Sequence, residues 1–352
     1  MLAAAATVFA VTWLSYAVAL RAYRRFRLLD FPERYALKRT ERLPYPTGLV
    51  AVAVFVCAMA VLLPFREKEL GLLAAVAILA ITSFIDDRTP LPSWVRLCVQ
   101  IAVAVILFVT GSRIYSITNP LGGVLKLDSV SLYTAFFGSL PVLSGLFTLG
   151  WLLLTINALN WLDGVSGQVS VLSTIGFLML GFLAFFRNGE TEIALIAFIL
   201  AAIAGAGALF DFPPPKMLIG DTGSMFFGLM LGLLSIYHGG KVATAFLALG
   251  LPLLDALFVV LGRIARGHSP FRGGQDHLHH RLLRYGWTER QIVALTAIVG
   301  MTFGVAALFL STPGKGIAAL LLVAVVLTLR LLAGSPTART PSERSQSQTP
   351  RA

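Results

Sequence analysis

The stretch IALIAFILAAIAGAGALF, residues Ile193–Phe210, contains only apolar and small residues, with no charge and no proline. A helix of about 20 such residues crosses the hydrocarbon core of a bilayer. Similar runs recur along the 352-residue chain, which is 57% hydrophobic and only 13% charged. Membrane β-barrels would instead alternate polar and apolar residues. The sequence therefore predicts an all-α, polytopic membrane helix bundle.

Working outward from this stretch, we expect about eleven transmembrane helices in one catalytic membrane domain, residues 1–334. The predicted spans are Leu2–Leu20, Thr47–Pro64, Leu70–Ile85, Trp94–Gly111, Leu140–Ile156, Val169–Phe186, Ile193–Phe210, Gly223–Tyr237, Ala243–Ile264, Gln291–Leu310 and Ile317–Leu332. Residues 335–352 are rich in Ser, Thr, Pro, Arg and Gln, and this composition predicts a disordered cytoplasmic tail. The two cysteines, Cys57 and Cys98, lie inside apolar runs, and we expect buried free thiols.

The basic residues predict the orientation. Arg21, Arg24, Arg25 and Arg27 follow the first apolar run, whereas a cleaved signal peptide has its basic residues before the run. We therefore expect a retained helix with an outside N-terminus and, after eleven spans, a cytoplasmic C-terminus. The predicted inside segments then hold 21 of the 28 Lys and Arg residues, as the positive-inside rule requires. The net charge of +11 thus indicates loops against anionic headgroups, and no nucleic-acid partner is expected.

Polar residues of unusual type gather in the predicted cytoplasmic loops. Asp86 and Asp87 lie just past the end of the third span, where adjacent carboxylates indicate a cation site, general acid–base chemistry or simply a solvated helix end. Asn157, Asn160 and Asp163 are spaced by three, which places two amides and a carboxylate on one helical face. That loop has no Lys or Arg, and we favour a binding site there over a solvated face.

The loop before the eighth span reads DFPPPKMLIGDTGS, Asp211–Ser224. Its prolines predict an extended approach, and the glycines flanking Asp221 allow a ligand near the backbone. Asp221 is either a helix N-cap or a Mg²⁺ ligand, with the helix N-terminal amides facing a phosphate. Lys216 is a candidate substrate-binding cation.

The loop before the tenth span contains His268, His277, His279 and His280. Such a cluster can bind zinc, but the neighbouring arginines, Arg263, Arg266, Arg272, Arg281 and Arg284, favour a phosphate-rich anionic ligand. Asp255 lies inside the ninth predicted span, where a carboxylate is either functional or hydrogen-bonded within the bundle.

In this order, the acidic pair, NxxNxxDG, GDxGS and HxHHR resemble the motifs of the polyprenyl-phosphate N-acetylhexosamine-1-phosphate transferase family. By this resemblance, Asp86 and Asp87 match the acidic pair, Asn160 and Asp163 its Asn-x-x-Asp-Gly element, and Asp221 its magnesium aspartate. His277, His279 and His280 match its nucleotide-sugar-binding histidines, and Lys38 or Arg39 its basic residue before a proline–glycine element. The chain departs from the family at Ser166 and Asp211, where members often have Asp and Asn.

The resemblance implies a Mg²⁺-dependent bacterial inner-membrane enzyme with a cytoplasmic active site; Mn²⁺ is an alternative ion. It would transfer N-acetylglucosamine-1-phosphate from a UDP-N-acetylhexosamine to polyprenyl phosphate and release UMP, as the first membrane step of envelope polysaccharide synthesis. The expected catalytic residues are Asp86, Asp87 and Asp163, the metal ligands are Asp221 and Asp163, and the substrate-binding residues are Lys38, Arg39, Asn157, Asn160, Lys216, Arg266, His277, His279, His280 and Arg281.

Several alternatives stay open at this point. The sugar could be muramoyl-pentapeptide or another UDP-linked sugar, and transfer could occur in one step or through a covalent aspartyl intermediate. A homodimer is an open assembly state. A secondary transporter is the alternative from another functional class, and a lipid phosphatase is the third; no repeated halves are visible that would favour a transporter.

Overall fold

The computed structural model describes residues 1–32, 41–62, 66–119, 123–134, 138–237, 242–269 and 274–334. Lys38, Arg39 and the predicted tail, 335–352, lie outside the described residues.

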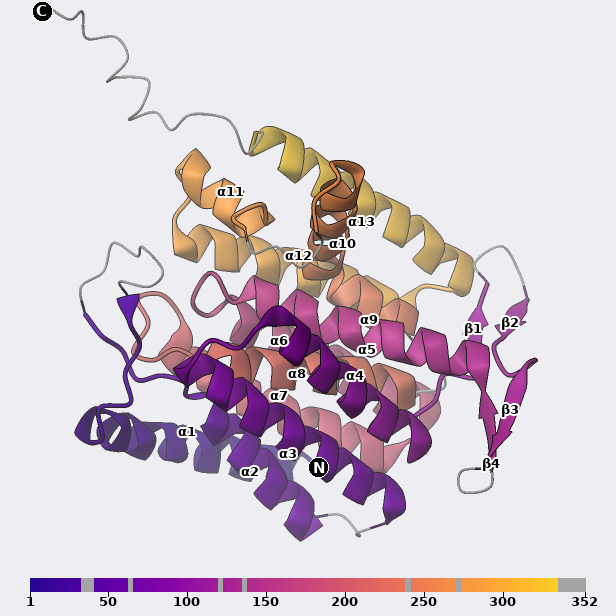
Figure 1. Ribbon diagram of the computed structural model, residues 1–352, viewed down its shortest axis with the longest axis horizontal. Helices are drawn as coiled ribbons and strands as arrows, with labels where there is room; N and C mark the ends of the chain where they lie inside the picture. Colours follow the sequence, from indigo (N-terminus) through magenta and orange to yellow (C-terminus); the bar gives the residue numbers. More distant parts are fainter. Residues whose placement is uncertain are drawn as a thin grey trace, which may run out of the picture.

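Long helices make up most of the described chain (Figure 1). They are α1 (Leu2–Arg25), α2 (Gly48–Leu62), α3 (Glu67–Arg88), α4 (Ser93–Val109), α5 (Val142–Leu162), α6 (Gln168–Leu183), α7 (Thr191–Asp211), α8 (Gly220–Tyr237), α9 (Val242–Ala248), α10 (Gly250–Ala265), α11 (Leu278–Tyr285), α12 (Glu289–Phe309) and α13 (Thr312–Leu332). A single π-helical turn, η2 (Ala184–Asn188), extends α6.

Within the described residues, seven helices are long and apolar enough to cross a membrane, or eight if the bent pair α9–α10 counts as one span. The helices α2 and α4 are apolar but shorter. These helices confirm a polytopic all-α membrane protein. Every predicted span corresponds to a helix or a helix pair, while the count of eleven and the orientation of the termini stay predictions.

The ninth predicted span, Ala243–Ile264, is wrong as a single helix, because α9 and α10 meet at 88°. Pro252 explains the break, since a proline in the interior of a continuous helix removes a hydrogen bond and clashes with the preceding turn. In the structure it lies in the first turn of α10, where proline is tolerated. Gly250 lies at the corner, and a Cβ there would come within 2.0 Å of the Leu322 side chain in α13.

The helix α8 is the central element of the bundle. Its residues are buried from Thr222 to Ile236, and α2, α3 and α5 pack around it. Small residues allow the close packing: a Cβ on Gly48 would lie 2.2 Å from the Gly223 nitrogen, and one on Gly228 would lie 2.6 Å from the Thr155 carbonyl oxygen. The first turn of α8 is therefore held rigidly by its neighbours.

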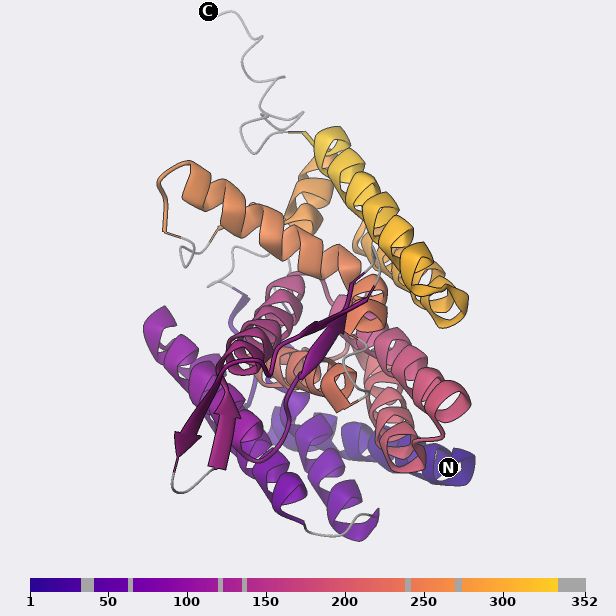
Figure 2. The same cartoon turned by 90° about the vertical axis from the view of Figure 1, so that its right-hand side faces the viewer.

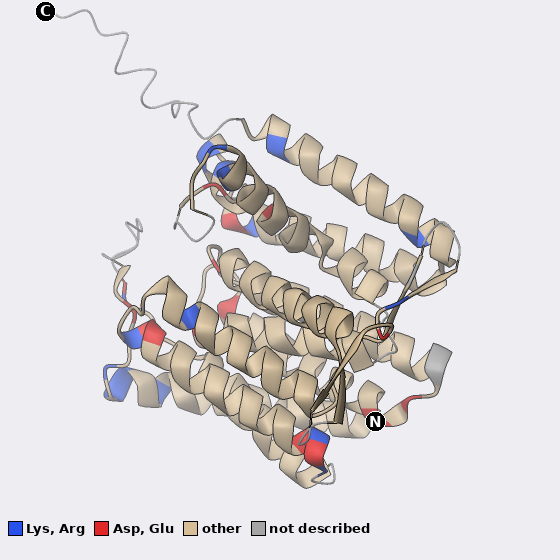
Figure 3. Ribbon diagram, turned by 45° about the vertical axis from the view of Figure 1, so that its right-hand side comes forward, with Lys and Arg blue, Asp and Glu red and all other residues tan. Residues whose placement is uncertain are grey.

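Two antiparallel hairpins follow the C-terminal end of α4 and lie together beside the helices (Figure 2). They pair β1 (Ser116–Thr118) with β2 (Val124–Lys126), and β3 (Ser131–Thr134) with β4 (Gly138–Pro141). Charged residues gather mainly at the helix ends and leave long uncharged stretches between them (Figure 3). Cys57 and Cys98 are free, as predicted, but the prediction that they are buried was wrong, because both are exposed on their helices. An apolar run does not reveal which helix face packs inward.

Candidate active site

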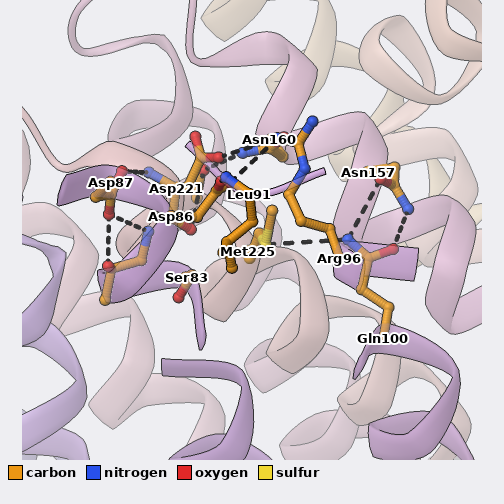
Figure 4. A network of polar contacts seen from close by, with 12 residues as sticks. Ser83, Asp86, Asp87, Leu91, Arg96, Gln100, Asn157, Asn160, Asp221 and Met225 are labelled. Atoms are coloured by element: carbon orange, nitrogen blue, oxygen red, sulfur yellow. Dashed lines mark hydrogen bonds and ion pairs between the residues drawn. The ribbon is translucent and has the colours of Figure 1, made fainter. Parts of the chain in front are cut away.

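The ends of α3, α5 and α8 meet at one end of the bundle (Figure 4). Asp86 and Asp87 lie in the last turn of α3, Asn160 in the last turn of α5, and Asp221 in the first turn of α8. The structure thus brings together residues that are far apart in sequence, as the motif order suggested.

Asp87 caps the N-terminus of α8. Its Oδ1 accepts hydrogen bonds from the Tyr45 hydroxyl and from the Asp221 backbone N–H at 2.8 Å. Its Oδ2 accepts from the backbone N–H of Thr222 at 2.9 Å and from the Thr222 hydroxyl at 2.6 Å. These donors occupy the lone pairs that a carboxylate offers. The expectation that α8 amides face a phosphate is therefore wrong for Asp221 and Thr222, because Asp87 already takes those N–H groups.

Glycine makes this cap sterically feasible. Gly220 has φ of +70°, and a Cβ there would meet Asp87 Oδ1, Pro46 and Tyr45, each at 2.8 Å. The segment before α2 also pairs with the segment before α8, since Thr47 and Gly48 donate their N–H groups to Leu218 and Ile219, both at 2.9 Å. Backbone hydrogen bonds therefore link the PTG stretch to the two residues that precede GDTG.

Asp86 points to a different set of partners. Its Oδ1 accepts from the Leu91 N–H at 2.6 Å, and its Oδ2 accepts from Arg96 of α4 at 3.2 Å. The same guanidinium nitrogen lies 3.6 Å from Asp221 Oδ2. Arg96 thus bridges two carboxylates from α3 and α8, and Figure 4 shows it between these residues and Gln100.

The amide ladder predicted on α5 has partners on two neighbouring helices. Asn157 and Gln100 of α4 exchange amide hydrogen bonds at 2.7 and 3.4 Å, and Gln100 also lies 3.9 Å from the Met225 sulfur. Asn160 donates to the Ser224 hydroxyl at 3.2 Å and hydrogen-bonds to the Asp221 side chain. The spacing by three therefore directs both amides toward the site, as the pattern indicated, although Asn157 is engaged in packing α4 against α5.

Negative charge is concentrated around Asp221 and Asp163. Burial, followed by the nearby Asp87 and Asp86, raises the pKa of Asp221 to about 8. Burial raises the pKa of Asp163 well above its ordinary range, and repulsion from Asp211, Asp221 and Asp87 adds to this effect. Within the described part of the chain, the Asp163 carboxylate has no hydrogen-bonding partner. Both groups would gain from a nearby cation.

A magnesium ion fits this donor set only if substrate completes its shell. Among the described residues, no group of three or more His, Cys, Asp and Glu side chains could hold a metal by itself. Mg²⁺ commonly binds through one or two carboxylates together with waters and substrate phosphates. Asp221 and Asp163, with raised pKa values and little hydrogen bonding, suit that mode, whereas the described histidines do not form a zinc site.

The histidine element lies against the loop that follows α5. The His277 ring packs on Trp161 at 5.5 Å between centroids and stacks on His279 at 6.0 Å. A Cβ on Gly164 would lie 2.2 Å from His279 Nε2, so the glycine of the DG motif admits that ring. The HxHHR and NxxNxxDG motifs are thus in direct contact.

Burial lowers the pKa of His280 to about 4 and lowers the pKa of His279 well below its ordinary range. Neighbouring histidines contribute to both shifts, and Arg284 contributes at His280. Both rings are therefore neutral near pH 7.

The remaining predicted cations either have structural partners or are exposed. Arg281 donates to the carbonyl oxygens of Arg330 at 3.2 Å and Gly334 at 3.0 Å, which caps the end of α13. Lys216 and Arg266 are exposed. Arg263 is buried and pairs with Asp276 at 3.3 Å. Substrate binding by Lys216, Arg266 and Arg281 stays a prediction, and these contacts give Arg281 a structural partner.

Sequence reasoning missed Tyr45, Arg96, Gln100 and Thr222. A signal existed for two of them, because Arg96 and Gln100 are isolated polar residues within an otherwise apolar span. Asp211 was treated as a departure from the family pattern. It caps α6, because its Oδ2 accepts from the Gly167 N–H at 3.0 Å and the Ser170 hydroxyl at 2.8 Å.

Several of the site residues lie in a region that matches a known protein family. The family described as glycosyl transferase family 4 matches residues 69–239, which include the acidic pair, the amide ladder and Asp221. A decaprenyl-phosphate N-acetylglucosaminephosphotransferase of Mycolicibacterium smegmatis is 30% identical over 74% of this chain and 67% of its own length. The chain belongs to the family of these polyprenyl-phosphate N-acetylglucosamine-1-phosphate transferases.

Other members of the family are similar over much of their length. The undecaprenyl-phosphate α-N-acetylglucosaminyl 1-phosphate transferase of Escherichia coli is 27% identical over 86% of this chain and 82% of its own. The corresponding probable transferase of Bacillus subtilis is 27% identical over 73% of this chain and 70% of its own. The resemblance inferred from four short motifs is therefore confirmed. The family match ends at residue 239, before the histidine element.

Proposed function

We propose that this family member transfers N-acetylglucosamine-1-phosphate from UDP-N-acetylglucosamine to a polyprenyl phosphate and releases UMP. The carrying observation is the cluster of Asp86, Asp163 and Asp221 with Arg96 at one end of an apolar helix bundle. The names of the similar proteins support the same transfer. The reaction joins a water-soluble donor to a membrane lipid, and polar residues at the end of a helix bundle can meet both.

In the proposed reaction, an oxygen of the lipid phosphate attacks the phosphorus that carries the sugar. A new P–O bond forms, the bond between that phosphorus and the UMP oxygen breaks, and UMP leaves with the bonding electrons. Mg²⁺, or Mn²⁺ in its place, would be held by Asp221 and Asp163 with the donor phosphates, and it would offset their charge. Arg96 can reach a phosphate oxygen, because its side chain is 36% exposed and it contacts both Asp86 and Asp221 through the same nitrogen, Nη1.

The two members of the acidic pair are proposed to have different roles. Asp86 remains the candidate to orient the lipid phosphate, because it faces Arg96 and Asp221. Asp87 is proposed as a positioning residue that fixes the first turn of α8. A covalent intermediate on Asp87 would require the attacking carboxylate oxygen to give up the two hydrogen bonds that it accepts. We therefore favour direct attack by the lipid phosphate over a covalent route through Asp87.

The membrane arrangement is part of the proposal. We infer eleven spans with the N-terminus outside and the C-terminus in the cytoplasm, in the inner membrane of a bacterium. The active site then faces the cytoplasm, where UDP-sugars are made, and the polyprenyl phosphate reaches it sideways from the bilayer. The excess of Lys and Arg in the inside segments supports this orientation.

Purified protein with polyprenyl phosphate, Mg²⁺ and a panel of UDP-sugars tests the function. We expect UMP release with UDP-N-acetylglucosamine, loss of release with a chelator, and loss in Asp221→Ala. Asp128→Ala is the matched control, since this exposed carboxylate lies between the hairpins. Absence of UMP release with every UDP-sugar from folded protein would contradict the proposal.

The same assay separates the alternatives. Release with UDP-muramoyl-pentapeptide alone would reassign the sugar, and free phosphate in place of UMP would indicate a phosphatase. Uptake of an unmodified solute into proteoliposomes would indicate a transporter. The structure gives no support to transport through Asp255, because its carboxylate is engaged by His277 and Arg330.

A further inference from the structure

Asp255 is a buried junction between three elements. Its Oδ2 lies 2.9 Å from His277 Nδ1, and both of its oxygens accept from the Leu278 N–H at 3.1 Å. Its Oδ1 also accepts from Arg330 of α13. The Asp255 and His277 side chains are 7% and 9% exposed, and that of Arg330 is 13% exposed. Asp255 in α10 thus joins the start of α11 to the end of α13.

The donors around Asp255 determine its charge state. Arg330 and the Leu278 N–H can only donate, and both act on this carboxylate. A carboxylate with such partners is ionised, so the proton between Asp255 and His277 lies on Nδ1 of the ring. The Nε2 atom is then the ring nitrogen left for a ligand. Once Nε2 takes up a proton it can donate to a phosphate oxygen, and the Asp255 carboxylate on Nδ1–H stabilises the imidazolium that forms. A carboxylate that fixes a histidine tautomer in this way is a recurring device in functional sites.

The His277 ring lies beside the loop that carries Asp163 and Gly164. The ring packs on Trp161, two residues before Asp163, and stacks on His279, which touches Gly164. The ring is therefore held beside the DG motif by contacts on its faces, while Asp255 holds its Nδ1 edge. Rotation of the ring would break the Asp255 contact and both ring contacts together.

We propose that Asp255 and Arg330 are positioning residues that hold the His277 ring so that its Nε2, once protonated, donates to a phosphate oxygen of the nucleotide-sugar. This inference rests on the proposed function for its substrate. Arg330 acts through Asp255, because its guanidinium donates to that carboxylate and keeps it ionised and in place. The Arg330 guanidinium also lies over the Phe258 ring of α10, with Cζ 5.9 Å from the ring centroid, and this contact keeps it against the same helix. The last helix of the described residues, α13, thereby contributes to a site that it does not enter.

Steady-state kinetics of Asp255→Asn and His277→Gln, alone and combined, test the coupling. We expect Asp255→Asn to raise KM for the UDP-sugar about 10-fold or more, as losses of such orienting groups do, with KM for polyprenyl phosphate unchanged. In the His277→Gln background the same change should add less than about 3-fold. A residue that only supports folding would lower the active fraction and leave both KM values unchanged.

Arg330→Met and Arg330→Lys extend the test to α13. We expect the methionine variant to raise KM for the UDP-sugar and the lysine variant, which keeps a cation, to recover part of the loss. Lys315→Met is the matched control, because it removes another cation of α13, whose Nζ donates to the Thr244 hydroxyl of α9 at 2.8 Å. An equal KM effect in Lys315→Met, or an undiminished effect of Asp255→Asn in the His277→Gln background, would overturn the proposal.

A second measurement is independent of turnover. In protein labelled with nitrogen-15 histidine, the signal that disappears in His277→Gln should show a protonated Nδ1 and, in the neutral ring, an unprotonated Nε2. Asp255→Asn should change this signal. If the wild-type protein does not turn over UDP-N-acetylglucosamine, the proposed function fails while the tautomer still decides the role of Asp255. A protonated Nε2 in the neutral wild-type ring would refute that role.

Discussion

Asp86 and Asp87 are adjacent and chemically identical, yet they have different environments. Successive residues on a helix point about 100° apart, so one carboxylate faces α8 backbone and the other faces Arg96. Sequence reasoning could place both in the site but could not divide their roles, because the division depends on which helix lies at each side of α3.

Asp87→Ala should therefore mainly reduce stability, whereas Asp163→Ala should mainly reduce turnover. Loss of Asp87 leaves four donors in a buried region without their acceptor, and we expect unfolding to become easier by about 2–4 kcal/mol. Asp163 has no hydrogen-bonding partner within the described residues, so its loss should abolish turnover while the thermal midpoint in detergent changes little. Equal loss of thermal stability in the two variants would contradict this division.

Gly164 is predicted to be indispensable for a steric reason. A methyl group there would lie 2.2 Å from His279 Nε2, and displacing that ring moves the histidine element away from Asp163. We expect Gly164→Ala to reduce kcat/KM by at least about 10-fold, as misplacement of active-site groups does. Gly150→Ala is the matched control on the preceding helix α5, because no atom lies within 4 Å of its added methyl. Similar activity of the two variants would show that the contact is unimportant.

At the scale of elements, apolar runs predicted the helices well and their interruptions poorly. The apolar pattern of Ala243–Ile264 does not reveal the bend, since both α9 and α10 are apolar. Pro252 is a sequence signal for the break, but the close contact of Gly250 with α13 appears only in the structure. The short helix α11 was also missed. Its polar sequence looked like a loop, and its position depends on the contact of the Leu278 N–H with Asp255, 23 residues away.

The helix α11 should make the protein sensitive to acid. The folded-state pKa of His280 is about 4 and its ordinary value is 6.5, so the unfolded chain binds a proton in this interval and the folded protein does not. This stability is present above pH 6.5 and is lost as the pH falls toward 4. By pH 5 the loss should be about 1–2 kcal/mol, measured as a lower thermal midpoint.

His280→Gln provides the control for this pH effect. The variant should lose less thermal stability than the wild type between pH 7 and pH 5, because it removes one of the groups that titrates. Parallel curves for the two proteins would show that His280 takes no part.

At the scale of the whole molecule, the charge pattern and the helices agree on a polytopic protein but leave its orientation as a prediction. A reporter that fluoresces only in the cytoplasm, fused after residue 352, should be bright. A phosphatase reporter that is active only outside the cytoplasm should be inactive at the same point and active when inserted between the β1–β2 and β3–β4 hairpins. The reverse pattern would contradict the inside assignment of the active site.

The arrangement of the site was predictable in outline because the motifs occur in alternate loops, which a membrane bundle brings to one face. Arg96 and Gln100 could not be assigned, since their importance comes from α4 packing beside α5. The sequence leaves two roles open for Asp255 for a similar reason, because its partner Arg330 lies 75 residues away.

The transfer of the phosphate together with the sugar is the central claim, and one labelling experiment tests it directly. UDP-N-acetylglucosamine that carries radioactive phosphorus in the phosphate attached to the sugar is incubated with polyprenyl phosphate, Mg²⁺ and the purified protein. We predict that the label enters the lipid fraction in an amount equal to the UMP released. Label that stays in the water phase as UDP while sugar enters the lipid would contradict the account, because it would show transfer of the sugar alone.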